Sequence, residues 1–387
     1  MRIMILLWTV LYGHELITWN YHHITIIERR TRQHAFFLTN NLYLILIKGL
    51  MMQTLISKSI NAITVVAFCF LTGTSFAGEK VLKLASFVPP IYVLHKPIFL
   101  KFAEDLSAAT NGSVSVKVYP SGELGKGPAE QYMRAVKRIA EITYGLPGYT
   151  SPMFPRNLLI ELPGVTNGHR DATEKIWKVM DKHLIGEYKR TRPLAVFVTP
   201  PAVFMMRDKP IRSLSDLKGL KIRVASKSAA SVIEAYGATP VQMPANKVYT
   251  SMSTGVVDGA LMGSDSLLIF KLIEPSKFVT IGLPEMPTTI FLVMNENAYN
   301  ELSSSEKSAL NSVTGLGMSL RAADGLAGFG KFALKKFAGI PGKEIIELSA
   351  AEQEKFNTAA AQGVKNIIRY QKSKGIPADK ILAAMKN

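Results

Sequence analysis

Strand and helix signals alternate along the chain from residue 80 onward, and this order constrains the fold more than any other feature. The segment KVLKLAS (80–86) is typical of a strand, and a helix is predicted from about Ile91 until Asn111 and Gly112 stop it. The segment SVSVKVYP (113–120) then alternates apolar and polar residues with a period of two. This β-α-β order predicts an α/β fold with parallel sheets.

The alternation continues to the end of the chain without an internal repeat or a low-complexity linker. Two α/β lobes must therefore be joined by strands that cross between them. We predict one lobe from residues 78–199 plus 285–325 and the other from residues 200–284 plus 326–387. The glycine-marked segment Ser304–Phe337 can form one very long helix that spans both lobes, although its glycines weaken it or permit close packing.

Residues 51–77 have the pattern of a secretory signal peptide. A short polar stretch with Lys58 precedes an apolar run from about Ile60 to Leu71, and small residues stand before Gly78. The alternative is a retained membrane anchor, but the run is shorter than the roughly 20 apolar residues that a membrane span needs. We predict cleavage after Ala77 and export to the periplasm.

Residues 1–50 precede this signal, and we interpret them as a mis-extended reading frame because signal peptides begin at the amino terminus. Met51 or Met52 is then the true start. The sole cysteine, Cys69, lies inside the signal, so the exported chain is free of cysteine. That composition suits export without disulfides.

The formal charge of +17 raises the question of nucleic-acid binding, because clustered Lys and Arg bind phosphate. The lysines are instead scattered along predicted helices, and no basic run is interleaved with aromatic residues. We therefore expect no nucleic-acid partner, and a solvated basic surface that can gather anionic solutes.

Signatures of enzymes are absent from the sequence. The segment GELGKGPAE resembles a phosphate-binding loop, but Gly127 stands where Ser or Thr would bind magnesium. There is no G-x-S-x-G or H-E-x-x-H motif, and the three histidines after residue 77 are widely spaced. We predict no catalytic residues, no metal site and no cofactor, hence binding without chemistry.

Four motifs carry a resemblance to a known family. They are FAEDLSAATNGSVSVKVYPSGELG, KPIRSLSDLKGLKIRV, MSTGVVDGA and FLVMNENAYNELSSSEKSAL, in this order. In this order and at this spacing the sequence resembles the solute-binding component of tripartite ATP-independent periplasmic (TRAP) transporters, DctP-like, over Lys80 to Ala384. The resemblance implies a two-lobe periplasmic-binding-protein architecture, and as partners a small organic carboxylate and the large and small subunits of a membrane permease. We expect a monomer.

In that family the lobes close over a small organic anion, and an arginine of the K-I-R-V strand clamps its carboxylate. Arg223 occupies this position. A guanidinium offers two parallel donors to a carboxylate, which lysine cannot copy. The alternative interpretation is a surface arginine on an edge strand.

Two departures from the family pattern indicate a less polar pocket. Met262 stands where many members have Asn, and Val203 where a second arginine is frequent. An apolar pocket is predicted around one carboxylate from Tyr149, Met153, Phe204, Met205 and Met262. Hydrogen bonds to the ligand are predicted from Tyr144, Ser264 or Asp265. We therefore expect a monocarboxylate with an apolar or aromatic tail.

Two other functions remain open at this level. The same two lobes could serve a ligand sensor that signals to a membrane receptor, because the fold does not separate transport from sensing. A secreted enzyme could use the same cleft, and turnover of a bound carboxylate would reveal it.

Overall fold

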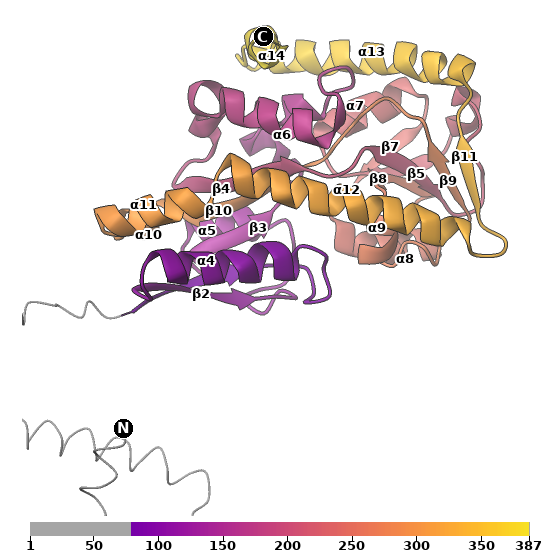
Figure 1. The fold of residues 1–387 in the computed structure, drawn as a ribbon. Coiled ribbons are helices and arrows are strands. Elements are labelled where there is room, and N and C mark those ends of the chain that lie inside the picture. Colours follow the sequence, from indigo (N-terminus) through magenta and orange to yellow (C-terminus); the bar gives the residue numbers. More distant parts are fainter. Residues whose placement is uncertain (1–78, 387) are drawn as a thin grey trace, which may run out of the picture. The chain divides into compact units, whose positions relative to one another are not determined.

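A computed structural model describes residues 79–386, which form one compact unit with two β-sheets (Figure 1). The predictions for residues 1–50 and 51–77 lie outside the described residues. Each sheet and its helices form one lobe. None of the helices in the described range combines the length and hydrophobicity needed to cross a membrane.

The sheet of the first lobe has five strands in the order β2-β1-β3-β10-β4. Their bounds are β1 Lys80–Ala85, β2 Val114–Tyr119, β3 Ile142–Gly145, β4 Thr191–Val198 and β10 Thr289–Asn295. Strands β1, β2 and β3 are parallel, whereas β10 runs antiparallel to both of its neighbours.

The sheet of the second lobe has six strands in the order β11-β9-β5-β8-β6-β7. Their bounds are β5 Ala202–Met206, β6 Lys221–Val224, β7 Thr239–Gln242, β8 Gly259–Gly263, β9 Phe278–Ile281 and β11 Glu344–Glu347. Strand β5 runs antiparallel to β8 and β9. The prediction of purely parallel sheets is therefore wrong at β5 and β10, because these are the strands that arrive from the other lobe.

Two connections between strands cross from one lobe to the other. Strand β4 of the first lobe passes into β5 through Thr199–Pro201, and β9 returns to β10 through residues 282–288. The two crossings are held together, since Thr199 N donates to Thr288 O at 2.9 Å and Thr288 N donates to Thr199 Oγ1 at 2.9 Å. These bonds define a hinge of two adjacent strands.

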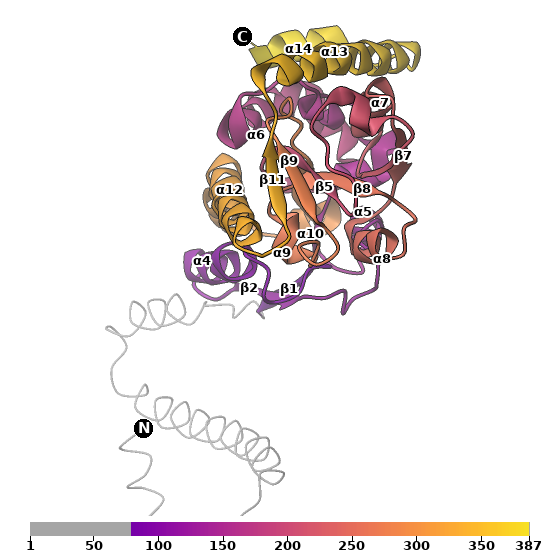
Figure 2. The ribbon, with the colours of Figure 1, turned by 90° about the vertical axis from the view of Figure 1, so that its right-hand side faces the viewer.

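The helices pack around the two sheets (Figure 2). Their bounds are α4 Lys101–Ala109, α5 Gln131–Val136, α6 Gly168–Val179, α7 Lys227–Ala235, α8 Val248–Ser253, α9 Ser266–Ile269, α10 Glu296–Asn300, α11 Ser304–Val313, α12 Leu316–Ala338, α13 Ala350–Ser373 and α14 Ala378–Lys386. Short helical turns lie at His95–Leu100, Pro147–Met153, Asn157–Glu161, Met180–Leu184, Ile185–Glu187, Leu214–Leu217 and Ala245–Lys247.

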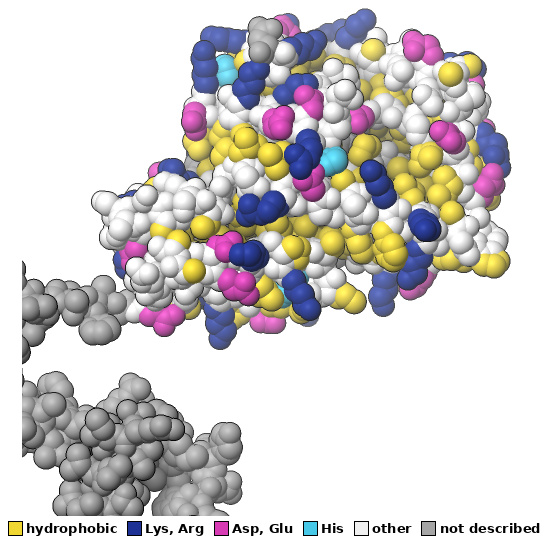
Figure 3. Space-filling model, viewed as in Figure 1, with side chains coloured by type: hydrophobic (Ala, Val, Ile, Leu, Met, Phe, Trp, Pro, Cys, Tyr) yellow, Lys and Arg dark blue, Asp and Glu magenta, His cyan; other side chains and the backbone are white. Residues whose placement is uncertain are grey.

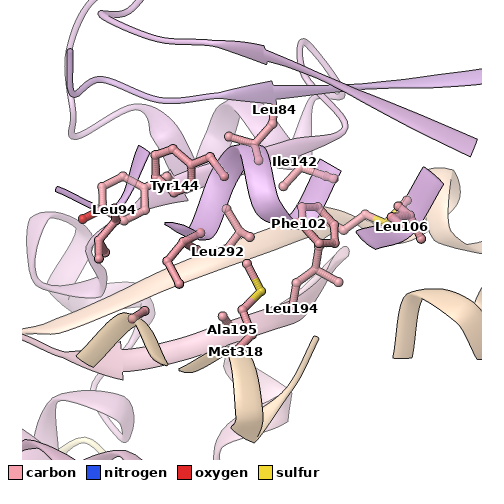
Figure 4. Close-up of a cluster of buried hydrophobic side chains, with 14 of the residues drawn as sticks. Leu84, Leu94, Phe102, Leu106, Ile142, Tyr144, Leu194, Ala195, Leu292 and Met318 are labelled. Atoms are coloured by element: carbon pink, nitrogen blue, oxygen red, sulfur yellow. The ribbon is translucent and has the colours of Figure 1, made fainter. Parts of the chain in front are cut away.

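Helix α12 spans both lobes, as the sequence predicts (Figure 1). Its first half contributes Met318 and Leu326 to the core of the first lobe, shown in part in Figure 4. Its last turns contribute Ala333 and Phe337 to a core of the second lobe. A single helix is thus anchored in two cores.

The predicted helix Ser304–Phe337 is interrupted between α11 and α12. Gly315 has a φ of 79°, a left-handed conformation that glycine adopts without strain. Its N–H donates to Leu194 O at 2.7 Å, which ties the break to β4. The helix that spans the lobes is therefore α12 alone.

The C-terminal helices return to the first lobe. Helix α13 packs on α7 of the second lobe, but Ile367 near its end and Ile381 and Met385 of α14 belong to a core cluster with Phe291 of β10. This packing differs from the predicted assignment of all of 326–387 to the second lobe. The division of the chain into lobes at exact residues remains a proposal.

Candidate ligand-binding site

A cavity lies between the two lobes beside the crossing strands. Its walls include Tyr144 of β3 and Ile290 of β10 from the first lobe, and Arg223 of β6 and Met262 of β8 from the second. The cavity volume is about 40 Å³. A small organic molecule therefore requires the lobes to move apart before it can enter.

Arg223 is buried in the interior of the second sheet, with 2% of its surface exposed. Strand β6 lies between β8 and β7, so the alternative of a surface arginine on an edge strand is wrong. The Nε and Nη2 atoms donate to Met243 O at 3.0 and 2.8 Å. Because a guanidinium has five N–H donors, donors remain for other partners at the cavity.

Tyr149 neighbours this guanidinium and also joins the lobes. Burial lowers the pKa of Arg223, and the electrostatic effect of the nearby Tyr149 hydroxyl partly offsets this. Ala245 N of the second lobe donates to Tyr149 Oη at 3.0 Å, and Gln242 Nε2 donates to Gly148 O at 3.1 Å. Tyr149 therefore belongs both to the contact between the lobes and to the wall of the cavity.

Glu161 joins the lobes at a second point. Its Oε2 accepts from Ser226 Oγ of the second lobe at 2.6 Å, and its Oε1 accepts from Thr289 N of the first at 2.8 Å. Ser226 is also the N-cap of α7, accepting from Ala229 N at 3.3 Å. Burial raises the pKa of Glu161 from 4.5 to about 7, and the bonds from Ser226 and Thr289 partly oppose this.

We expect this carboxyl to make stability depend on pH. Between pH 4.5 and about 7 the folded protein retains a proton on Glu161 that the unfolded chain releases, so stability falls as the pH rises through 7. The shift corresponds to roughly 3 kcal/mol. Urea unfolding at pH 5.5 and pH 8 should show a smaller pH difference for Glu161→Gln than for the wild type. Glu234→Gln, on the exposed face of α7, is the control, and equal pH differences in Glu161→Gln and wild type would contradict the assignment.

A second polar group lies at Asp265, between β8 and α9. Its side chain is buried, and burial raises its pKa from 3.8 to about 7 against the effect of the backbone N–H groups of Asp265 and Ser266. Nearby, the hydroxyls of Tyr92 and Tyr144 are hydrogen-bonded to each other at 2.6 Å. The cavity therefore combines one buried cation, one buried carboxyl and a tyrosine pair within apolar walls.

The family model for bacterial extracellular solute-binding protein, family 7 (DctP), matches residues 84–371. The chain belongs to this family. Among similar solved structures is a TRAP solute-binding protein from a marine metagenome, described as specific for aromatic acid ligands and bound to metahydroxyphenylacetate. It is 26% identical with a TM-score of 0.75, and the match covers 80% of this chain and 98% of that one.

Two further relatives are similar to this family 7 protein. A TRAP solute-binding protein from Rhodoferax ferrireducens, solved with copurified benzoate, is 25% identical with a TM-score of 0.75, covering 79% of this chain and 96% of that one. A Comamonas testosteroni protein named outer membrane transporter protein TsaT is 28% identical over 62% of this chain and 72% of its own length. The predicted two-lobe α/β fold is confirmed by the solved neighbours.

The family and these neighbours are solute-binding receptors rather than enzymes, so the prediction of a non-enzymatic protein is confirmed. TRAP solute-binding proteins are periplasmic and work with TRAP membrane subunits. No group of three or more His, Cys, Asp or Glu side chains within residues 79–386 is placed to hold a metal ion. On the face in Figure 3, basic side chains gather along the upper edge, and basic and acidic side chains are interspersed over the rest.

The structure of this TRAP solute-binding protein brings five of the nine predicted site residues to the cavity: Tyr144, Tyr149, Arg223, Met262 and Asp265. Their contacts with a ligand stay a prediction.

The other four predicted residues lie outside the cavity lining. Met153 is 39% exposed at the surface, and Ser264 is buried beside α12, where a Cβ on Gly330 would lie 2.4 Å from its Oγ. Phe204 and Met205 of β5 point into opposite cores of the second lobe, because both faces of this strand are covered. Placing these four residues at the pocket was therefore wrong.

Most of the lining was missed from the sequence. The additional lining residues are Phe87, Val88, Tyr92, Leu146, Thr199, Ala225, Ala245, Gly263, Ser266, Ile269, Phe270, Thr288 and Ile290. Nearly all of them lie in loops or at strand ends, and several flank the hinge. The one usable signal was their position next to the carboxyl ends of predicted strands.

Proposed function

We propose that the protein is the periplasmic receptor of a TRAP transporter, and that it captures a small monocarboxylate with an apolar or aromatic tail. Closure of the lobes encloses the ligand, and the receptor then delivers it to an ion-gradient-driven permease with large and small membrane subunits. The observation that carries this proposal is the buried guanidinium of Arg223 at a cavity with largely apolar walls.

The carboxylate end of the ligand is assigned to Arg223. A planar guanidinium binds a carboxylate through two parallel hydrogen bonds, and these are stronger where water is excluded. Met243 O fixes the plane of the guanidinium before a ligand arrives. This preorganisation reduces the entropy lost on binding.

The tail of the ligand is assigned to the aromatic and aliphatic walls. Phe87, Tyr144, Met262, Ile269 and Phe270 line the space around the guanidinium. Phe87 and Tyr144 are stacked, with ring centroids 5.5 Å apart. Flat apolar surfaces of this kind favour an aromatic ring, and the ligands named for the two solved relatives, metahydroxyphenylacetate and benzoate, are aromatic acids.

The remaining elements of the proposal concern export and assembly. The chain is cleaved after Ala77, reaches the periplasm and acts there as a monomer. Mass spectrometry of the protein recovered from the periplasm tests the cleavage site, and a mature chain that begins elsewhere than Gly78 would contradict it.

A thermal-shift screen of the purified protein tests the ligand class. The panel contains benzoate, hydroxybenzoates, mandelate and branched-chain acids, with malate, succinate and glucuronate as polar comparisons. A ligand at one hundred times its Kd stabilises the folded state by about 2.7 kcal/mol, which raises the melting temperature by several degrees. Hits confined to the hydroxylated or dicarboxylic comparisons would contradict the apolar-tail assignment.

A further inference from the structure

Asp265 presents an unpaired oxygen in the buried wall of the cavity. The residue is 4% exposed, and its Oδ1 has no hydrogen-bond partner among the described residues. A buried acceptor without a donor is unfavourable, and such atoms are rare in folded proteins. A donor group on a molecule in the cavity would remove this cost.

The backbone makes room for this carboxyl. A Cβ on Gly263 would lie 2.4 Å from Asp265 Oδ1 and 3.1 Å from Thr199 Cβ, so a larger residue at 263 would displace the carboxyl from its place. The glycine at the end of β8 therefore positions Asp265 beside the hinge.

Asp265 and Arg223 reach the cavity from different strands of the same sheet. The Arg223 side chain starts on β6 and extends to Met243 O, two residues beyond its register partner Val241 of β7. Asp265 instead follows the end of β8. We therefore assign the carboxyl and the guanidinium to different parts of a bound molecule.

The hydrogen-bonded tyrosines Tyr92 and Tyr144 line the cavity together with Asp265. The charge of Asp265 contributes to the raised pKa values of Tyr92 and Tyr144, although burial is the main cause for both. Because the two tyrosine hydroxyls bind each other, one O–H of the pair is already used, and the other can still donate to a ligand. Asp265 is the only carboxyl among the described residues that line the cavity.

We propose that Asp265 selects the remote end of the ligand: it binds a hydroxyl or other neutral donor there and rejects a second carboxylate. The proposal rests on the proposed function, since it assumes that Arg223 holds the first carboxylate. Both forms of the Asp265 carboxyl can accept a hydrogen bond from a hydroxyl, whereas the ionised form repels an anion. The ligand class is therefore a monocarboxylic acid with an apolar or aromatic body and a hydroxyl at its remote end.

The test is a comparison of dissociation constants by calorimetry at pH 8, with protein purified after expression of the full chain. The probes are benzoate, 3- and 4-hydroxybenzoate, and the dicarboxylate isophthalate. For the wild type, the better hydroxybenzoate should bind about tenfold more tightly than benzoate, and isophthalate at least about tenfold more weakly.

Two variants separate hydrogen bonding from charge. In Asp265→Leu the hydroxyl advantage should disappear while benzoate still binds. In Asp265→Asn the advantage should persist, but the penalty on isophthalate should fall at least about tenfold because the repelling charge is gone. Ser264→Ala, at the neighbouring buried residue outside the lining, should change none of these ratios.

The outcomes distinguish this inference from the function on which it rests. If the wild type binds benzoate and both hydroxybenzoates equally, or if Asp265→Leu weakens all probes alike, the role of Asp265 is overturned while the receptor function stands. If the wild type binds none of the four acids, both the inference and the aromatic-acid assignment are overturned.

Discussion

Replacing Arg223 with alanine should lower the affinity for a carboxylate ligand by two to four decades. Removing one partner of a buried ion pair costs roughly 3–5 kcal/mol, because the remaining charge is left buried and unpaired. The affinity of Arg223→Lys should lie between those of Arg223→Ala and the wild type, since an ammonium keeps the charge but cannot form the two parallel bonds. Calorimetric titration with the best ligand of the thermal-shift screen measures each value.

The matched control is Arg207→Ala. Arg207 follows β5 on the same sheet, bonds to Met252 O at 3.3 Å and Asp208 Oδ2 at 2.6 Å, and lies outside the cavity lining. Its loss should leave affinity unchanged. If Arg223→Ala binds the ligand with wild-type affinity, and circular dichroism shows that it is folded, then Arg223 does not bind the ligand carboxylate.

Gly148→Val should prevent closure and lower ligand affinity by about two decades without unfolding the protein. At Gly148 the first lobe lies directly against the second beside the cavity, since a Cβ there would lie 3.0 Å from Ser226 Cβ and 3.2 Å from Ala225 O. The two additional methyl groups of valine require the lobes to separate. Because apparent affinity scales with the population of the closed form, a rarer closed form binds more weakly.

Calorimetry and small-angle X-ray scattering together check this prediction. In the wild type, ligand should reduce the radius of gyration, whereas in Gly148→Val the radius should stay constant. Gly186→Val is the matched control, because no atom lies within 4 Å of a Cβ at that exposed position. Ligand-induced contraction of Gly148→Val at wild-type affinity would show that this contact does not limit closure.

The burial of Arg223 could be predicted because the signal is local: a cation in the short apolar strand Leu220–Val224 must be buried or half-buried. Its role toward a carboxylate, which the family resemblance implies, stays a prediction. The two-lobe fold was predictable for a similar reason, since alternating strands and helices without a linker require crossing strands.

The remaining site could not be predicted because tertiary contacts decide it. Strand β5 reads Ala-Val-Phe-Met-Met. Alternation along a strand puts Phe204 and Met205 on opposite faces, but no polar residue distinguishes the two faces, so the sequence did not show that both are covered by cores. Tyr92 and Phe270 lie outside regular strands, and only the packing of the first helix and of α9 brings them to the cavity. Glu161 carried no signal because its partners are 65 and 128 residues away.

The anchoring of α12 in both cores limits the ways in which the receptor can move. Met318 and Phe337, near the two ends of the helix, are both buried. The lobes can therefore separate only if the helix bends or if one of its ends loses its packing in a core. Gly325, Gly328 and Gly330 lie between these two buried ends and lower the cost of a bend there. Opening and closing of the receptor should therefore bend α12 in this glycine-rich stretch while both of its ends stay packed.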